Sequence, residues 1–315
     1  MIQVRINETF VSYICIKEEI MGALKTLRDT KTLFPDTVTN EFINDMPRRE
    51  LTEEEKALPY SKYYFKDMAK IPQEDLDLVN AGPIDPSKAL PIEQAARLLD
   101  DGYLDTETGF CQMPDGTGFA ATKVFMPGVT TEMIDWWFNW HPLEGLRYAI
   151  WCPVAHSGIS AKTPEAHLDS SGTPLHTRNI GRVHYPIEGF DLKGAQLIEI
   201  AFYSPEIFGI SKEQLEASSM STFEIATCTS VKPRTPINIF FHAIREVDGG
   251  IEYRSRYWLK YTVKDGKPCK SGSPFPTKSQ LYYMARCNCI HSLTEYNNLA
   301  SILPQIYDEM GGKIE

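Results

Sequence analysis

The sequence predicts an α+β fold in which a curved antiparallel sheet wraps around one long C-terminal helix. Five runs rich in β-branched or aromatic residues lie between residues 181 and 263 and are separated by turn residues, which is typical of strands joined by hairpins. Near the C-terminus, apolar residues recur at helical spacing from Ile290 to Tyr307. Such a sheet and helix leave a cavity between them, which is the helix-grip arrangement of START and pollen-allergen domains.

The 315 residues divide at a predicted boundary near residue 90. This length suits one large domain, or a domain of about 200 residues with an extension. We expect residues 1–90 to form a partly helical extension, with its clearest helix over 17–28, and residues 91–315 to form the catalytic helix-grip domain. Prolines punctuate the chain around the boundary, namely Pro72, Pro83, Pro86 and Pro91.

The second domain begins with a short helix, a hairpin and a tryptophan-rich helix. The short helix is expected over 92–99. Two strands are expected around Pro114-Asp115-Gly116, because proline presets φ and glycine tolerates a positive φ. Thr130 or Thr131 can cap the next helix, which runs to Trp140.

A polar stretch follows to about Asn179, and strands are expected to dominate after it. Asp248-Gly249-Gly250 is the clearest hairpin turn among them. Pro304 interrupts the apolar stripe of the C-terminal helix, so a kink is expected there. The five strand-like runs are GRVHYPIEGF (181–190), AQLIEIAFYS (195–204), TFEIATCTSV (222–231), INIFFHAIREV (237–247) and IEYRSRYWLKYTV (251–263).

Charge and cysteine content narrow the classes of function. The formal net charge of −10 argues against a nucleic-acid or anionic-membrane partner, because either needs a face rich in Lys and Arg. No apolar run is long enough to span a bilayer, and the first residues lack the pattern of a secretory signal. The seven scattered cysteines suit a reducing compartment. We therefore expect a cytoplasmic protein that binds a small molecule.

An aromatic cluster in the extension leaves two interpretations open. Tyr60, Tyr63, Tyr64 and Phe65 could lie at a subunit interface, which favours a homodimer. They could equally pack on the chain's own catalytic domain.

Histidines and carboxylates occur where three separate elements could bring them into one cavity. His291 and Glu295 are four residues apart on the C-terminal helix and share a face. His184 and Glu188 are four apart in a strand-like run and share a sheet face. Together with His156 they supply imidazole and carboxylate, which suit zinc. A hydrogen-bonded core or surface position remains the commoner explanation for any single histidine.

Other aromatic and polar residues have simpler interpretations. His141 is expected to have a structural role at the end of the tryptophan-rich helix, whereas His167 and His176 are expected to be exposed. Cys287 and Cys289 are expected on a strand before the C-terminal helix, which disfavours a zinc site of the CxC-x-H type. Four tryptophans are expected mainly to pack, with one or two at the edge of the cavity: Trp136, Trp137, Trp140 and Trp151.

Five long motifs occur in a fixed order along the chain. They are GYLDTETGFCQMPDGTGFAA, MPGVTTEMIDWWFNWH, RYAIWCPVAH, the hairpin from INIFFHAIRE to IEYRSRYWL, and HSLTEYNNLASILPQIY. Together they resemble the family of 2,4-diacetylphloroglucinol hydrolase and phloretin hydrolase, over residues 95–310. The resemblance implies a zinc-dependent hydrolase that cleaves the carbon–carbon bond between an acyl group and a polyhydroxylated aromatic ring. A small aromatic polyphenolic ketone is then the expected substrate.

The resemblance also implies roles for individual residues. His184 is an alternative to Glu188 as the ligand from the middle of the chain. Positioned His and Tyr side chains are expected to relay protons and to bind phenolic oxygens. The expected zinc ligands are His156, Glu188, His291 and Glu295. The expected catalytic residues are His242, Tyr148 and Tyr257, and the expected substrate contacts are Tyr148, Tyr257 and Trp151.

Two other functions remain open at the level of the sequence. The first is a non-catalytic carrier of aromatic or apolar small molecules, because helix-grip cavities also suit simple binding. A carrier has no need for a converging set of metal ligands. The second is a zinc enzyme with different chemistry on an aromatic ketone or ester.

Overall fold

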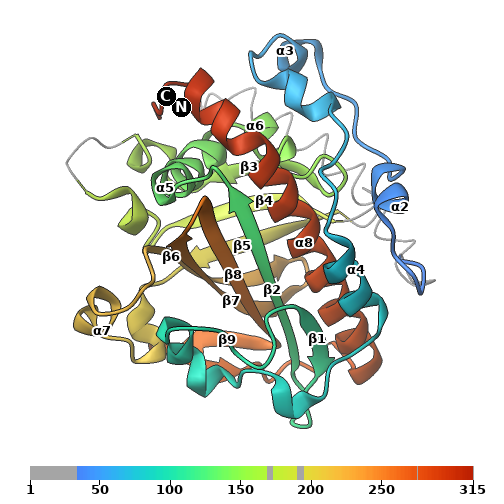
Figure 1. The fold of residues 1–315 in the computed structure, drawn as a ribbon, viewed down its shortest axis with the longest axis vertical. Helices are drawn as coiled ribbons and strands as arrows, with labels where there is room; N and C mark the ends of the chain where they lie inside the picture. The colour runs from blue at the N-terminus through green and yellow to red at the C-terminus, as the bar shows by residue number, and fades with distance from the viewer. Residues whose placement is uncertain (1–33, 169–172, 190–194, 275, 315) are drawn as a thin grey trace, which may run out of the picture.

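The computed structural model describes residues 34–168, 173–189, 195–274 and 276–314. The helix expected over 17–28 lies outside the described residues. Figure 1 shows an α+β arrangement in which a large sheet lies beside one long helix, α8. The predicted class, with its antiparallel sheet and long C-terminal helix, is therefore confirmed.

Eight of the described strands form one antiparallel sheet in the order β1-β2-β8-β7-β6-β5-β4-β3. Each of its neighbouring pairs is antiparallel, and the β7–β8 hairpin turns where it was predicted, with Val247 opposite Gly250. The strands are β1 (Gly109–Gln112), β2 (Gly118–Pro127), β3 (His156–Ala161), β4 (Val183–Glu188), β5 (Gln196–Phe202), β6 (Thr222–Val231), β7 (Arg234–Val247) and β8 (Gly250–Leu259). A small second sheet contains β9 (Tyr261–Lys264) and β10 (Lys267–Lys270).

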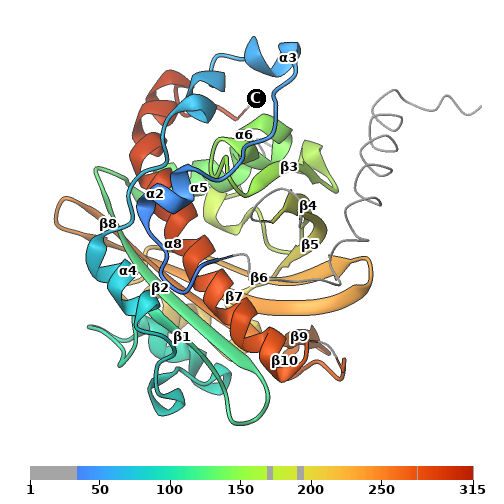
Figure 2. The ribbon, with the colours of Figure 1, turned by 90° about the vertical axis from the view of Figure 1, so that its right-hand side faces the viewer.

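Helix α8 (Lys278–Glu309) runs diagonally across the sheet and packs against β1, β2 and β8 (Figure 2). It begins well before Ile290, so the predicted start was wrong. Thr277 and Gln280 form a capping box at its true N-terminus. Cys287 and Cys289 consequently lie on this helix and not on a strand. The helix continues through Pro304 to its end.

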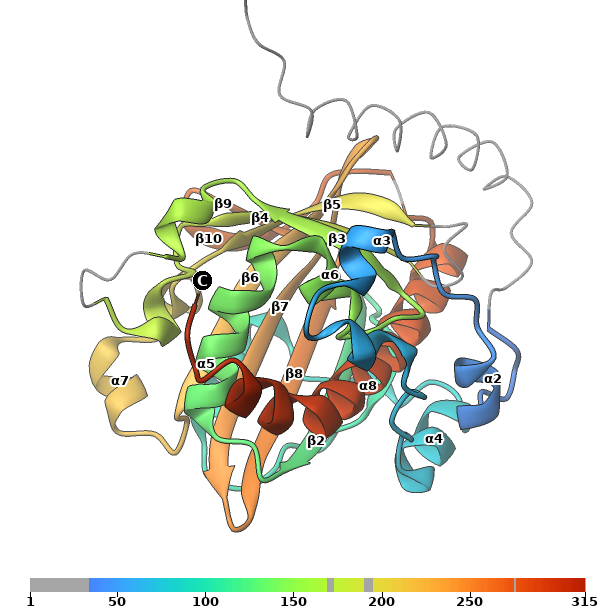
Figure 3. The same cartoon turned by 90° about the horizontal axis from the view of Figure 1, so that it is seen from above.

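The tryptophan-rich helix α5 (Thr131–Trp140) has the predicted bounds, and Thr130 accepts a hydrogen bond from the Met133 backbone as its N-cap. Figure 3 shows α5 beside the C-terminal end of α8. Trp136 and Trp140 are buried there and stack with ring centroids 4.8 Å apart. The predicted packing role of these tryptophans is thus confirmed.

The described part of the extension packs against α8. Asn298 accepts a hydrogen bond of 3.0 Å from the Ala69 backbone. The hydrophobic cluster of α5 and α8 also contains the buried side chains of Tyr60, Tyr63 and Tyr64. For these three tyrosines, the prediction that they pack on the chain's own domain is confirmed. The helices of this part are α2 (Asn40–Asn44), α3 (Glu53–Lys56), η1 (Ser61–Phe65), α4 (Gln73–Asn80) and η2 (Pro86–Lys88). The helix η3 (Ile92–Leu99) follows after the predicted boundary and has the predicted bounds.

Two predicted segments differ from the structure. Part of the polar stretch after His156 is the strand β3, whose small residues form a strand because they pair with β4. The run expected over 251–263 is two strands, because Lys260 adopts a positive φ of 68° and turns the chain. The remaining short helices are η4 (His141–Leu143), α6 (Gly145–Ala149), η5 (Pro164–Ala166), η6 (Leu175–Thr177), η7 (Pro205–Phe208) and α7 (Lys212–Glu216).

No helix within the described ranges has both the length and the apolar character needed to cross a bilayer.

Candidate active site

A cavity of about 100 Å³, open at its mouth, lies between the sheet and α8. Each of the predicted site residues except His156 lines it. The lining residues are Phe138, His141, Tyr148, Trp151, Ile159, His184, Glu188, Ile200, Phe202, Cys228, Asn238, Phe240, His242, Tyr257, Asn288, His291, Glu295 and Tyr296.

Two of the predicted metal ligands form a cross-strand pair. His156 begins β3 and lies opposite Glu188, which ends β4. The register of this pair of strands shifts directly after His156. The fully buried His156 places Nε2 3.9 Å from Glu188 Oε2.

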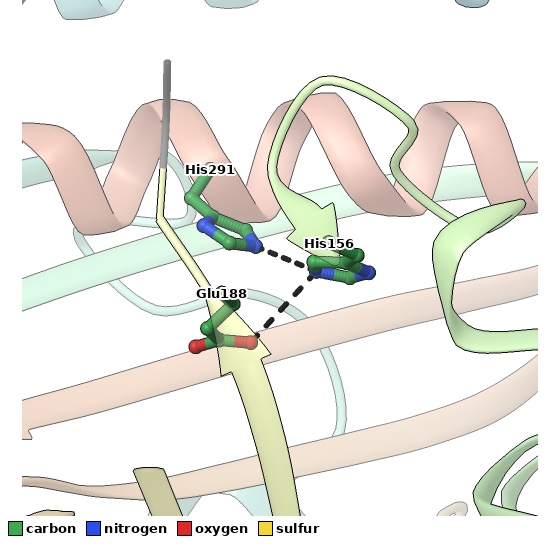
Figure 4. Close-up of side chains that lie close together, drawn as sticks. All are labelled: His156, Glu188 and His291. Carbon is green, nitrogen blue, oxygen red and sulfur yellow. Dashed lines mark hydrogen bonds and ion pairs between the residues drawn. The ribbon is translucent and has the colours of Figure 1, made fainter. Parts of the chain in front are cut away.

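The other two predicted ligands come from one face of α8. His291 and Glu295 are one helical turn apart, with Nε2 and Oε2 separated by 3.6 Å. The two pairs meet, because His156 Nε2 lies 3.0 Å from His291 Nε2 and 3.5 Å from Glu295 Oε2. Figure 4 shows the His156, Glu188 and His291 side chains converging from β3, β4 and α8.

This donor set fits a divalent cation. His156 Nδ1 lies 3.2 Å from the Tyr148 carbonyl, so it carries the proton and leaves a lone pair on Nε2. Burial lowers the pKa of His156 well below its usual value, which keeps the ring neutral. Ligand atoms of His156, Glu188 and His291 all lie within 4.8 Å of one another. The donor-atom separations of 3.0, 3.5 and 3.9 Å from His156 Nε2 suit metal–ligand bonds of about 2.0–2.2 Å.

Tyr148 contacts both members of the cross-strand pair. Its hydroxyl donates a hydrogen bond to Glu188 Oε2. Its ring stacks on the His156 ring, with centroids 3.9 Å apart and planes at 4°. Burial and the nearby carboxylates raise the pKa of Tyr148 well above its usual value, so the hydroxyl stays protonated and orients the carboxylate.

His242 is held in one tautomer by a buried chain of hydroxyl groups. Tyr253 donates to Tyr296 over 3.1 Å, so the Tyr296 proton remains for His242 Nε2, also 3.1 Å away. His242 Nδ1 therefore carries a proton, which it donates to Ser255 Oγ over 2.9 Å. Burial lowers the pKa of His242 to about 3, and its ring is neutral.

Tyr257 and Trp151 occupy two other parts of the cavity wall. The Tyr257 hydroxyl donates to Ser292 Oγ over 3.1 Å, and its ring centroid lies 5.6 Å from that of His242. Trp151 Nε1 donates to the Glu295 carbonyl over 3.1 Å. Its N–H group is thus already bonded, and its ring is the part that faces the cavity.

Three further histidines, His141, His167 and His176, lie outside the predicted ligand set. The expectation that His167 is exposed was wrong: it is fully buried, with Nε2 3.0 Å from Nε2 of the cavity-lining His184. The structure thus pairs His184 with His167, and the possible metal-binding group within the described ranges is His156, Glu188 and His291. His141 lies at the C-cap of α5, 2.8 Å from the Trp137 carbonyl, as predicted. His176 is half-buried. Nothing in the local sequence of His167 indicated burial, because the residues that cover it come from other segments.

Comparisons with known proteins agree with the motifs. The family model described as the DAPG hydrolase PhiG domain matches residues 90–308. A phloretin hydrolase of Eubacterium ramulus is 31% identical over 270 residues, which cover 82% of this chain and 92% of that protein. A 2,4-diacetylphloroglucinol hydrolase of a Pseudomonas species is 28% identical over 270 residues, covering 80% of this chain and 88% of that protein. A 2,4-diacetylphloroglucinol hydrolase of Pseudomonas protegens is 27% identical, covering 80% and 85% respectively.

Proposed function

The chain belongs to the DAPG hydrolase PhiG domain family, and we propose that it is a zinc-dependent hydrolase of acylated polyhydroxybenzenes. The reaction breaks the bond between the aromatic ring carbon and the acyl carbon. Water supplies a hydroxyl group to the acyl carbon and a proton to the ring carbon, so the products are a carboxylic acid and the free polyphenol. An acylphloroglucinol or a phloretin-like ketone is the proposed substrate.

The observation that carries the proposal is that two imidazole nitrogens and two carboxylates meet in the wall of an aromatic-lined cavity. We propose that His156, Glu188, His291 and Glu295 hold the metal. When bound, zinc acts as a Lewis acid that polarises oxygen and lowers the pKa of water toward about 7. A carrier of apolar molecules would have no need for these four groups to meet.

The chain's own side chains supply the remaining chemistry. Ring hydroxyls ortho and para to the acyl group make the ring carbon basic, so a positioned proton donor suffices to protonate it. Tyr148 and Tyr257 are assigned to the phenolic oxygens, because both residues line the cavity and their hydroxyl oxygens can accept a hydrogen bond from a phenol. His242 relays the proton, since its Nε2 shares a hydrogen with Tyr296. Trp151 is assigned to stacking on the aromatic ring.

Metal analysis coupled to product detection tests the proposal. The purified protein is expected to hold stoichiometric zinc and to release free or mono-acyl phloroglucinol from phloretin and diacetylphloroglucinol. His156→Ala and His291→Ala are expected to lose both properties while circular dichroism shows them folded. Folded variants that keep full zinc and full activity would contradict the metal assignment. Zinc without turnover of either compound would favour a different reaction, and a protein that binds no metal would favour a carrier.

Three broader features belong to the same proposal. We propose that the sheet and α8 form a helix grip, with a division of the chain near residue 90. A homodimer is also proposed, and the aromatic residue Phe65 of the extension is 62% exposed. A cytoplasmic location is supported by the free state of six cysteines, while Cys15 lies outside the described residues.

A further inference from the structure

Two asparagines form an amide pair in the wall of the cavity. Asn238 lies on β7 and Asn288 on α8, and both line the cavity. Asn238 Nδ2 donates to Asn288 Oδ1 over 3.1 Å. Asn238 is 5% exposed, and its Oδ1 has no hydrogen-bond partner among the described residues. The pair therefore contains a buried acceptor that no described residue satisfies.

An unsatisfied buried acceptor points to a ligand group. Leaving such an atom unpaired is unfavourable, and most buried polar atoms in folded proteins have a partner. The amino group of Asn288 makes no hydrogen bond within the described part of the chain either. The pair thus offers one acceptor and one donor, which together match a hydroxyl group, since a hydroxyl both donates and accepts.

The amide pair and His242 mark opposite ends of the cavity. Asn238, Phe240 and His242 alternate along β7 and face the cavity, so the first and last are separated by about 13 Å. On α8, Asn288 and Tyr296 are separated by about 12 Å along the helix axis. Tyr296 contacts His242, as Asn288 contacts Asn238. His291 lies between the two ends.

The two ends differ in chemistry. The end at His242 is rich in hydroxyl groups, because Tyr257 and Tyr296 both line it. That composition suits a polyhydroxylated ring. The opposite end is lined by Ile200 and Cys228, and Cys228 lies directly across the sheet from Asn238. Phe240 lies between the two ends, where its ring stacks on that of His242. The amide pair is thus set in an apolar wall.

We propose that the Asn238–Asn288 pair binds a terminal hydroxyl on the acyl tail of the substrate. This inference rests on the proposed function, in which His291 helps to hold the metal, and it adds that the acyl carbonyl lies near His291. An acyl tail with an apolar linker and a hydroxyphenyl end fits the apolar wall and reaches the amides, whereas an acetyl group does not reach them. The pair then selects two-ring ketones with a hydroxylated tail over short acyl chains.

Binding of two related acids to the metal-loaded full chain tests the proposal. The probes are 3-(4-hydroxyphenyl)propanoate and 3-phenylpropanoate, which differ only in the tail hydroxyl. Quenching of tryptophan fluorescence gives the dissociation constants, because Trp151 lines the cavity. The hydroxylated acid is expected to bind about 10- to 100-fold more tightly, the range for one buried polar group left unpaired. Equal affinities would overturn the proposal.

Variants of the amide pair test whether these two side chains cause the preference for the hydroxylated acid. Asn238→Leu is expected to reduce the ratio of the two affinities to within about threefold. Asn288→Ala is expected to reduce it as well, and it provides the same information if Asn238→Leu fails to fold. The matched control is Asn297→Leu on α8, because the Asn297 side chain bonds the Leu293 carbonyl of its own helix. The control keeps the wild-type ratio, and a preference unchanged in both amide variants would overturn the assignment.

Turnover separates this inference from the proposed function. Phloretin is compared with the analogue that lacks only the tail hydroxyl, and kcat/KM is expected to favour phloretin. If neither ketone is cleaved but the acids still differ in affinity, the proposed reaction fails and the hydroxyl site stands. If both ketones are cleaved equally and the acids bind equally, the hydroxyl site fails and the proposed reaction stands.

Discussion

Replacing Tyr148 with phenylalanine removes one hydroxyl and leaves the ring that stacks on His156. The hydroxyl donates to Glu188 Oε2, and Tyr148 is 4% exposed. The ring stacking, with centroids 3.9 Å apart, is expected to survive the substitution, because phenylalanine keeps the ring. The change therefore isolates a single hydrogen bond to a proposed metal ligand.

The size of the effect follows from the type of hydrogen bond. A hydrogen bond to a charged acceptor contributes about 1.5–3 kcal/mol. If that free energy orients Glu188 toward the metal, its loss weakens metal binding by about 10- to 100-fold, as for other groups that orient metal ligands. Tyr148 is also proposed to contact the substrate, so kcat/KM of the variant is expected to remain about 10-fold below the wild-type value even when the metal is saturating.

Competition with a chromophoric chelator measures the zinc affinity, and steady-state kinetics at saturating zinc measure the second effect. Tyr282→Phe is a matched control, because Tyr282 lies on α8 with its side chain partly exposed. A zinc affinity of Tyr148→Phe equal to that of the wild type would refute the orienting role. Full recovery of kcat/KM with saturating zinc would instead refute the substrate contact.

Three further substitutions test other parts of the site and scaffold. Ser255→Ala removes the acceptor for His242 Nδ1, and kcat is expected to fall about 10-fold while metal analysis still finds stoichiometric zinc. His141→Gln tests the pH dependence of stability. Burial lowers the pKa of His141 from its usual 6.5 to about 3, so between these two pH values this histidine is protonated in the unfolded chain but not in the folded one. As the pH is lowered through this range, the free energy of unfolding of the metal-free wild type should therefore fall more steeply than that of the variant. The difference in slope should be about 1.4 kcal/mol per pH unit, measured by urea denaturation. Trp136→Ala is expected to lower the free energy of unfolding by about 3–5 kcal/mol in the same assay, because Trp136 is fully buried.

Local sequence signals predicted the elements whose causes are local. The Asp248-Gly249-Gly250 turn and the Thr130 cap depend on a few neighbouring residues, and both were located correctly. The N-terminus of α8 also had such a signal, the capping box of Thr277 and Gln280. The β-like run of tyrosine and cysteine after it favoured a strand, and packing of α8 on β1 and β2 overrides that preference.

Features that depend on distant segments could not be read from the sequence. The β3 residues have weak strand propensity and form a strand only because β4 lies beside them. His167 is buried by residues from other segments, such as His184. The Asn238–Asn288 pair joins residues of β7 and α8, and neither asparagine belongs to a recognisable motif.

The candidate metal centre shows why family resemblance was needed in addition to periodicity. Helical spacing predicts that His291 and Glu295 share a face, but it cannot tell that His156 and Glu188 lie opposite each other on β3 and β4. Hydrogen bonds that do not involve the donor atoms hold the His291–Glu295 pair close to the His156–Glu188 pair. Trp151 donates to the Glu295 carbonyl, and the Asn298 side chain donates to the Trp151 carbonyl over 2.9 Å. These bonds tie α8 to the segment that precedes β3, so the distance between the two pairs depends on tertiary contacts that neither pair encodes alone.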